Sequence, residues 1–167
     1  MDRTDTSSVA PHEHPSARAP GDDLLPRTHF EPADGIPLPA GTVVSAAAAR
    51  EHARAVVLRH WNSASRGASE AALIDLLLVV SELTTNAIRH GGGLAAFEVT
   101  PTGEGVRLTV QDNSDVVPAV AFGSGELPVG HHGNGYGWPL IIRLAREITI
   151  TPRPGGGKTI SVLVPLA

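Results

Sequence analysis

Apolar residues recur every three or four positions over the segment 70–90, and this spacing predicts an amphipathic helix. The stripe consists of Leu73, Leu76, Leu77, Val80, Leu83, Ala87 and Ile88. Ser69 can cap the start of this helix, because its hydroxyl can accept a hydrogen bond from a free backbone N–H group. The run 91–93 is all glycine and predicts the end of the helix, since glycine adopts the left-handed conformation that closes helices.

A shorter apolar stripe predicts a helix over 46–61, with Ser45 as its cap. Its members are Ala49, Ala53, Val56, Val57 and either His60 or Trp61. A further helix is expected to begin near 135–138 and to run to Ala145 or Arg146.

Runs rich in valine, leucine, phenylalanine and threonine predict two strands over 94–100 and 106–111. The five residues between these runs predict an antiparallel hairpin. A second pair of strands is expected over 148–151 and 159–164, around a turn at 152–157. The elements together predict an α/β (α+β) fold, a two-layer sandwich whose mostly antiparallel mixed sheet has helices on one face.

The segment 113–134 is rich in Pro, Gly, Ser and Asp and is longer than most connections inside a domain, which is typical of a lid or a binding loop. At the other end of the chain, prolines stand at 11, 15, 20, 26, 32, 37 and 39, with small and polar residues between them. This composition predicts a mostly disordered tail over 1–41, followed by one globular domain over 42–167.

The composition of the chain excludes several classes of function. The 167 residues include no cysteine, which excludes disulfides, thiol catalysis and cysteine-ligated zinc. The formal net charge of −4 lacks the basic excess of a nucleic-acid binder, so no direct nucleic-acid partner is expected. The sequence shows neither an unbroken apolar run of membrane-spanning length nor a secretory signal pattern, so we expect a cytoplasmic protein without a membrane partner.

Three polar residues follow one side of the predicted helix over 70–90. Glu82, Asn86 and His90 are spaced four apart, so each is rotated by only about 40° from the previous one. An Asn carbonyl oxygen suits Mg²⁺, and a Glu one turn earlier can polarise a hydroxyl that attacks a metal-bound phosphate. The alternative is that these residues form only the solvent face of an amphipathic helix.

Two other segments favour a nucleotide site. Asp112 follows a predicted strand and can accept a hydrogen bond from an exocyclic amine such as that of adenine. Gly133, Gly135 and Gly137 precede a predicted helix, where free backbone N–H groups can bind phosphate oxygens. Read alone, Asp112 is a turn residue and the glycines are loop residues. The segment 155–159 ends like a P-loop, but Pro152 stands where that motif needs glycine and a strand is predicted to follow, so a hairpin turn is favoured.

Taken in order, four segments resemble the ATP-binding boxes of the GHKL superfamily, which comprises gyrase, Hsp90, histidine kinases and MutL. They are Glu82-Leu83-Thr84-Thr85-Asn86-Ala87-Ile88-Arg89-His90-Gly91, Asp112-Asn113-Ser114, Gly135-Tyr136-Gly137-Trp138-Pro139-Leu140 and Gly157-Lys158-Thr159. Within the superfamily the sequence is most similar to the serine/threonine kinases of the anti-sigma-factor type, whose helix also reads Glu-Leu-x-x-Asn-Ala-x-x-His-Gly. The similarity spans roughly 45–165.

This resemblance implies a Bergerat-type ATP-binding fold with ATP and Mg²⁺ as cofactors. It implies that Glu82 is the general base, that Asn86 coordinates Mg²⁺ and that Asp112 contacts the adenine amino group. The nucleotide site would also include His90, Ser114, Gly133, Gly135, Gly137 and Trp138, with Thr159 supporting the adenine contact. The glycines of the family's Asp-x-Gly-x-Gly box are replaced by Ser114 and Val116, which leaves the Asp but stiffens the loop.

The resemblance further implies a regulatory protein partner, such as an anti-anti-sigma factor or a sigma factor, and it allows a homodimer. Two functions follow. The first is a kinase that phosphorylates a serine or threonine of an antagonist protein, a reaction that depends mainly on alignment and charge neutralisation. The second is a non-catalytic module that regulates a sigma factor or another partner by binding, and the altered Asp112-Asn113-Ser114 box keeps it open.

Overall fold

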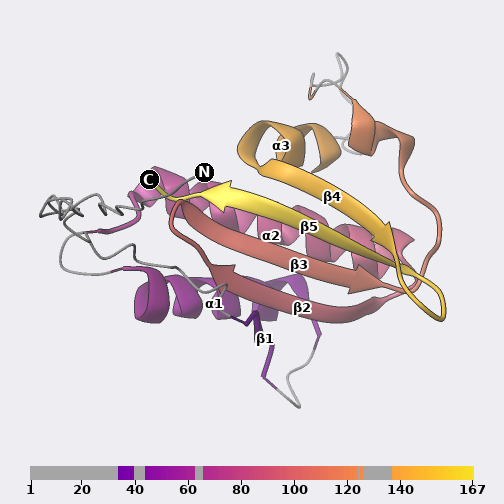
Figure 1. Cartoon of the computed structure of the whole chain (residues 1–167), viewed down its shortest axis with the longest axis horizontal. Coiled ribbons are helices and arrows are strands. Elements are labelled where there is room, and N and C mark those ends of the chain that lie inside the picture. Colours follow the sequence, from indigo (N-terminus) through magenta and orange to yellow (C-terminus); the bar gives the residue numbers. More distant parts are fainter. Residues whose placement is uncertain (1–33, 40–43, 63–65, 124, 126–136) are drawn as a thin grey trace, which may run out of the picture.

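Backbone hydrogen bonds between neighbouring strands form a five-stranded sheet (Figure 1). The computed structural model describes residues 34–39, 44–62, 66–123, 125 and 137–167. The sheet has the order β1-β2-β3-β5-β4. Its strands are β1 (Ile36–Pro37), β2 (Leu94–Pro101), β3 (Gly105–Asp112), β4 (Arg146–Pro152) and β5 (Lys158–Pro165). Every pairing between these described strands is antiparallel, so the predicted antiparallel sheet is confirmed and its expected mixed character is not found.

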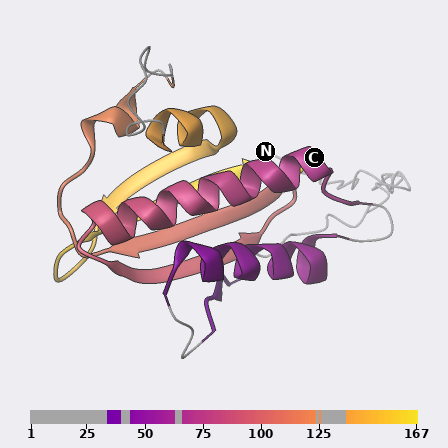
Figure 2. The same cartoon turned by 180° about the vertical axis from the view of Figure 1, so that it is seen from behind.

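Three helices cover one face of this sheet (Figure 2). They are α1 (Ala46–Val56), α2 (Glu70–His90) and α3 (Gly137–Leu144). The long helix α2 runs between the other two. The predicted two-layer α/β sandwich with helices on one face is therefore confirmed.

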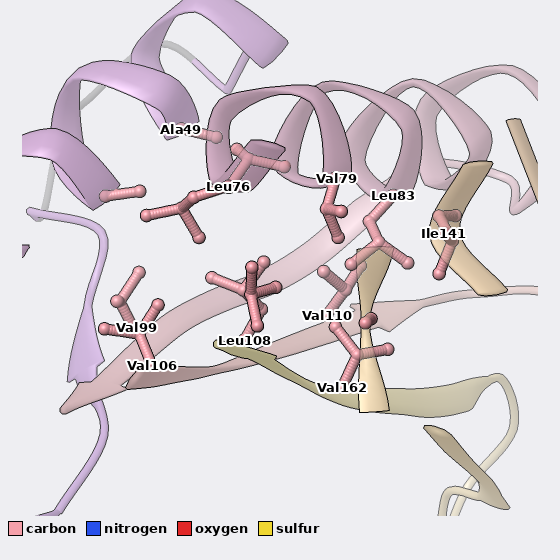
Figure 3. Close-up of a cluster of buried hydrophobic side chains, with 14 of the residues drawn as sticks. Ala49, Leu76, Val79, Leu83, Val99, Val106, Leu108, Val110, Ile141 and Val162 are labelled. Carbon is pink, nitrogen blue, oxygen red and sulfur yellow. The ribbon is translucent and has the colours of Figure 1, made fainter. Parts of the chain in front are cut away.

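The core lies between α2 and the inward side chains of the central strands (Figure 3). Leu76, Val79 and Leu83 of α2 are fully buried and face side chains of β3 and β5 such as Leu108 and Val162. Burying one such side chain contributes about 1.5–3 kcal/mol through removal of apolar surface from water. This packing fixes which side of α2 faces the sheet, and with it where the polar residues of α2 lie.

The ends of α2 lie where the sequence predicts them. The Ser69 hydroxyl accepts a hydrogen bond from the Ala72 N–H at 3.1 Å. At the other end, the Gly91 N–H donates to the carbonyl oxygens of Asn86 and Ala87, each at 3.0 Å, and Gly92 has a positive φ of 68°. These contacts satisfy backbone groups that every helix end leaves free.

The predicted helix over 46–61 is also present, although its last turn differs. After α1 the chain forms a π-helical turn over Val57–Trp61. Trp61 is buried while His60 is exposed, so Trp61 is the core member of the stripe. The Trp61 indole Nε1 donates to the Thr102 carbonyl at 3.1 Å, which connects this turn to the β2–β3 hairpin.

The sheet begins inside the segment 1–41 that the sequence assigns to a disordered tail. Ile36 and Pro37 pair with Val99 and Glu98 of β2, and the Leu38 N–H donates to the Phe97 carbonyl at 2.9 Å. Residues before the boundary predicted at 42 therefore belong to the sheet, because the edge of β2 supplies the hydrogen-bond partners that an isolated segment lacks. The remainder of that segment, apart from 34–39, lies outside the described residues.

Helix α2 has a mean hydropathy of 1.6 over its most apolar stretch, so by length and composition alone it could cross a membrane. Six of its residues are buried in the core, five of them apolar, and the helix lies on the sheet. A helix that packs in a protein core can have the same length and hydropathy, and the burial of α2 on the sheet agrees with that interpretation.

Candidate functional site

Glu82 and Asn86 lie on the side of α2 that faces the start of α3. The helical repeat places them one turn apart, and both are half-buried. Gly137, the first residue of α3, lies against both of them. A Cβ atom at this position would be 2.5 Å from Glu82 Oε2 and 3.6 Å from Asn86 Nδ2. A side chain at this position would require the Glu82 carboxylate to move away from the start of α3.

The start of α3 is electrostatically favourable for an anion. The N-terminus of a helix carries partial positive charge and free N–H groups, so it attracts carboxylates and phosphates. Because Glu82 reaches the start of α3, its carboxylate is placed beside the same helix end at which the sequence predicts phosphate binding.

Asn86 carries a polar atom that is left without a partner. Its Nδ2 is buried and has no hydrogen-bond partner among the described residues. Such a group loses its hydration without compensation, at a cost of about 1–3 kcal/mol. Rotation of the amide about its last bond presents either its nitrogen or its oxygen to the same point. The residue is therefore suited to a polar ligand, either a phosphate oxygen or a hard cation such as Mg²⁺.

Asp112 forms a second cluster at the end of β3. It is buried, with 3% of its surface exposed, and it is paired across the sheet with Lys158, the first residue of β5. The Lys158 Nζ lies 3.0 Å from Asp112 Oδ1 and 2.9 Å from Oδ2. The two charged side chains therefore form a buried salt bridge on the face of the sheet that carries the helices.

The surrounding backbone encloses Asp112 closely. The Ser114 N–H donates to Asp112 Oδ1 at 3.0 Å, and the Ser114 carbonyl accepts from Lys158 Nζ at 3.0 Å. A Cβ atom at Gly91 would lie 2.6 Å from Asp112 Oδ2, and one at Gly157 would lie 2.0 Å from its main-chain oxygen. Asp112 therefore lies at the point where the end of α2, the end of β3 and the β4–β5 turn come together.

Gly91 connects the two clusters. Its N–H group donates to the Asn86 carbonyl, while its Cα lies against the Asp112 carboxylate. Asn86, the predicted metal residue, therefore lies in the last turns of α2, and Asp112, the predicted base-contacting residue at the end of β3, packs against the end of that helix.

Other predicted site residues lie in different surroundings. His90 is exposed at the end of α2, and Gly133 and Gly135 lie outside the described residues. Trp138 is 6% exposed and belongs to the hydrophobic core. Its apolar ring packs inward from the first turn of α3, and a contact between Trp138 and the nucleotide stays a prediction.

The role of Thr159 in supporting the adenine contact likewise stays a prediction, and strand alternation decides to which face its side chain points. Successive residues of a strand point to opposite faces, and Lys158 and Ile160 are both buried on the helix side. Thr159 therefore faces away from Asp112, opposite Gln111 and Thr151 on the neighbouring strands.

Lys158 is the site residue that sequence reasoning missed. A signal for it exists, because Lys158 is the only lysine in the chain. It also stands in phase with Ile160, Val162 and Val164, the inward residues of an alternating strand. A lone lysine at an inward position indicates a paired charge, since buried lysines are rare unless they are paired.

An open cavity of ≈ 470 Å³ lies at the opposite end of α2 and includes none of the predicted site residues. It is lined by Gly67, Ser69, Ala71, Ala72, Asp75, Arg143, Leu144, Pro165, Leu166 and Ala167.

Comparison with known proteins agrees with this fold. A family described as the histidine kinase-like ATPase domain matches residues 44–163, which covers the sandwich from α1 to β5. No curated protein matches the chain significantly. The match supports the resemblance to the GHKL-type ATPases, and the Asn86 side chain beside the start of α3, whose Nδ2 has no hydrogen-bond partner among the described residues, fits a phosphate-bound Mg²⁺. The chain belongs to the histidine kinase-like ATPase domain family, whose members bind ATP.

Proposed function

We propose that this protein binds Mg-ATP and transfers the γ-phosphoryl group to a serine or threonine of a regulatory protein, as a kinase of the anti-sigma-factor type. The observation that carries the proposal is the buried Nδ2 of Asn86, which has no hydrogen-bond partner among the described residues and lies, like the Glu82 carboxylate, beside the first residue of α3. Membership of an ATP-binding family supports the nucleotide.

Each residue of this cluster has a chemical role in the proposal. The Asn86 carbonyl oxygen is a ligand for Mg²⁺, which neutralises charge on the phosphates. The start of α3 at Gly137 binds phosphate oxygens through its N–H groups. Glu82 accepts the proton of the attacking hydroxyl. Among the described residues no group of three His, Cys, Asp or Glu side chains could hold a metal, which suits a cation held mainly by phosphates.

The partner in this proposal is an anti-anti-sigma factor, a sigma factor or a similar regulatory protein, and the protein acts in the cytoplasm, alone or as a homodimer. Asp112 is the residue that binds the amino group of the adenine base, with Ser114 beside it.

One observation favours a second candidate, a module that regulates its partner by binding without catalysis. Both carboxylate oxygens of Asp112 already contact the Lys158 ammonium. If this arrangement excludes the base, the fold serves only as a protein-binding scaffold.

The first prediction concerns Asn86. Mg-ATP should raise the melting temperature of the native protein, because a ligand at 100 times its Kd stabilises the folded state by about 2.7 kcal/mol. The variant Asn86→Ala should lose the Mg²⁺-dependent part of this shift while its far-UV circular dichroism stays unchanged.

A matched control is Thr85→Ala, since Thr85 is also half-buried on α2 but is rotated by about 100° from Asn86. It should keep the shift. A native protein that shows no shift at millimolar Mg-ATP would support the binding-only module, and an unimpaired Asn86→Ala would place the metal elsewhere.

The second prediction concerns Glu82. With a partner captured by nucleotide-dependent pull-down, the native protein should transfer phosphate from γ-labelled ATP to a serine or threonine of that partner. Glu82→Gln keeps the shape of the side chain but removes the base, so transfer should fall by about 10²–10⁴-fold. ATP binding measured by calorimetry should persist. Equal transfer rates in the variant would remove Glu82 from the role of base.

A further inference from the structure

The ammonium group of Lys158 is buried and lies among acceptor oxygens of the protein. Lys158 is 4% exposed, and its Nζ contacts Asp112 Oδ1 at 3.0 Å, Asp112 Oδ2 at 2.9 Å and the Ser114 carbonyl at 3.0 Å. An ammonium group has three donors. The contacts with Asp112 Oδ1 and with the Ser114 carbonyl are hydrogen bonds, and the contact with Oδ2 is an ion pair, so the group is held by acceptors of the protein itself.

The carboxylate of Asp112 is occupied in the same way. Both of its oxygens contact Lys158, and Oδ1 also accepts the Ser114 N–H. The side of Oδ2 is closed by Gly91, where even one added carbon would lie 2.6 Å away. The group that would bind the base is therefore held by a donor from the protein itself.

An adenine amino group is a poor substitute for this donor. Hydrogen bonds in which donor and acceptor are both charged are stronger than those of a neutral amine, and separating a buried salt bridge leaves a charge unpaired. The internal pair should therefore persist unless the base supplies other contacts in compensation. The cluster of Asn86, Glu82 and Gly137 shares no hydrogen bond or ion pair with Lys158 among the described residues, so phosphate binding there does not need the pair to open.

We propose that Lys158 competes with the base of the nucleotide for Asp112, and so is a specificity-determining residue that weakens ATP binding at the base end while leaving the phosphate end unaffected. This inference rests on the proposed function, because it takes Asp112 as the base-contacting residue. It predicts a site in which the triphosphate supplies most of the affinity.

The test is calorimetry with two probes, Mg-ATP and Mg-tripolyphosphate, on the native protein and on Lys158→Met. Methionine keeps much of the length of lysine but has no donor, so Asp112 becomes available to the base. The variant should bind Mg-ATP about tenfold more tightly, as expected when the open arrangement makes up about a tenth of the native population. Its affinity for Mg-tripolyphosphate should stay the same.

Arg153→Met is the matched control. Arg153 lies in the same β4–β5 turn and donates to the main-chain oxygen of Asp112 at 2.9 Å, so this variant also removes a nearby positive charge. It leaves the carboxylate paired with Lys158 and should give no gain that is confined to ATP. A similar gain in Mg-ATP affinity in both variants, or a gain in affinity for both probes, would mean that removal of any nearby positive charge has this effect. Either result would overturn the inference.

The remaining outcomes separate the two proposals. If the native protein binds Mg-ATP and Lys158→Met binds it equally or less tightly, the competition is disproved while the proposed function stands. If neither protein binds either probe, the proposed function fails and this inference fails with it.

A second measurement needs no variant. Because the chain has one lysine, a protein labelled with ¹⁵N-lysine gives a single side-chain ammonium signal in NMR spectra. Saturating Mg-ATP should shift or remove this signal, whereas Mg-tripolyphosphate should leave it in place. A signal that is unchanged at saturating Mg-ATP would overturn the proposal even if Lys158→Met does not fold.

Discussion

At the scale of single residues, the candidate site depends on glycines at close approaches. Gly137 lets α3 begin against the Glu82 carboxylate, and Gly91 lets Asp112 pack on the end of α2. Gly91 has a φ of −94°, which any residue can adopt, so its role is steric. Space at these two positions affects how close the Glu82 and Asp112 side chains come to the neighbouring helix.

We expect Gly91→Ala to lower the free energy of unfolding by about 1–3 kcal/mol, the usual cost of overpacking a filled site. The added carbon would lie 2.7 Å from the Ala87 carbonyl, a backbone atom that cannot rotate away. Urea denaturation of the native and variant proteins measures this difference.

Gly103→Ala is the control for that measurement, since an added carbon there has nothing within 4 Å. Its effect should stay within about 0.5 kcal/mol, as for most surface substitutions. Equal stability of the two variants would show that the end of α2 can move to accept a side chain.

The position of a site residue can be predicted from the sequence when it depends on local structure. It cannot be predicted when it depends on contacts with distant residues. Glu82 and Asn86 share one side of a helix, and the helical repeat alone predicts this. Trp138 and Thr159 were assigned from their place in a motif, and their directions are set instead by core packing and by strand alternation. Lys158 meets Asp112 only because β5 pairs with β3, a contact over a separation of 46 residues that no local pattern encodes.

At the scale of elements, the short strand β1 shows how pairing can form structure where composition predicts none. Its two residues lie in a proline-rich segment without alternation, but they gain partners on β2. The imidazole Nε2 of His52 on α1 also lies 2.9 Å from the Ile36 carbonyl, so both layers of the sandwich hold this strand. The longer elements follow from the sequence because each carries its own periodic apolar pattern and end signals.

Comparison of two shortened chains should measure the contribution of β1. A chain beginning at residue 34 keeps the strand, and one beginning at residue 44 lacks it but retains the whole region that matches the family. The shorter chain should fold and be less stable by about 1–3 kcal/mol, because it loses hydrogen bonds and partly buried apolar surface.

Urea denaturation of both chains checks this difference. Identical midpoints and slopes would mean that β1 adds no net stability and that the domain begins at α1 after all.

At the scale of the whole molecule, the two ends of the sandwich differ in chemistry. The end where β3 finishes and β5 begins holds the buried charges and the unpartnered amide. The other end holds the open cavity and the C-terminal residues Leu166 and Ala167. The core side chains of α2 separate these ends, so a ligand at one of them has no direct contact with the other.

The buried position of the one lysine also affects how the protein can be handled. Reagents that acylate primary amines need an exposed, uncharged amine, and Lys158 is enclosed and paired with a carboxylate. In a brief reaction on the folded chain, the α-amino group is the favoured target for a dye or a solid support. Attachment through it would join every molecule to the dye or support at the same point of the chain.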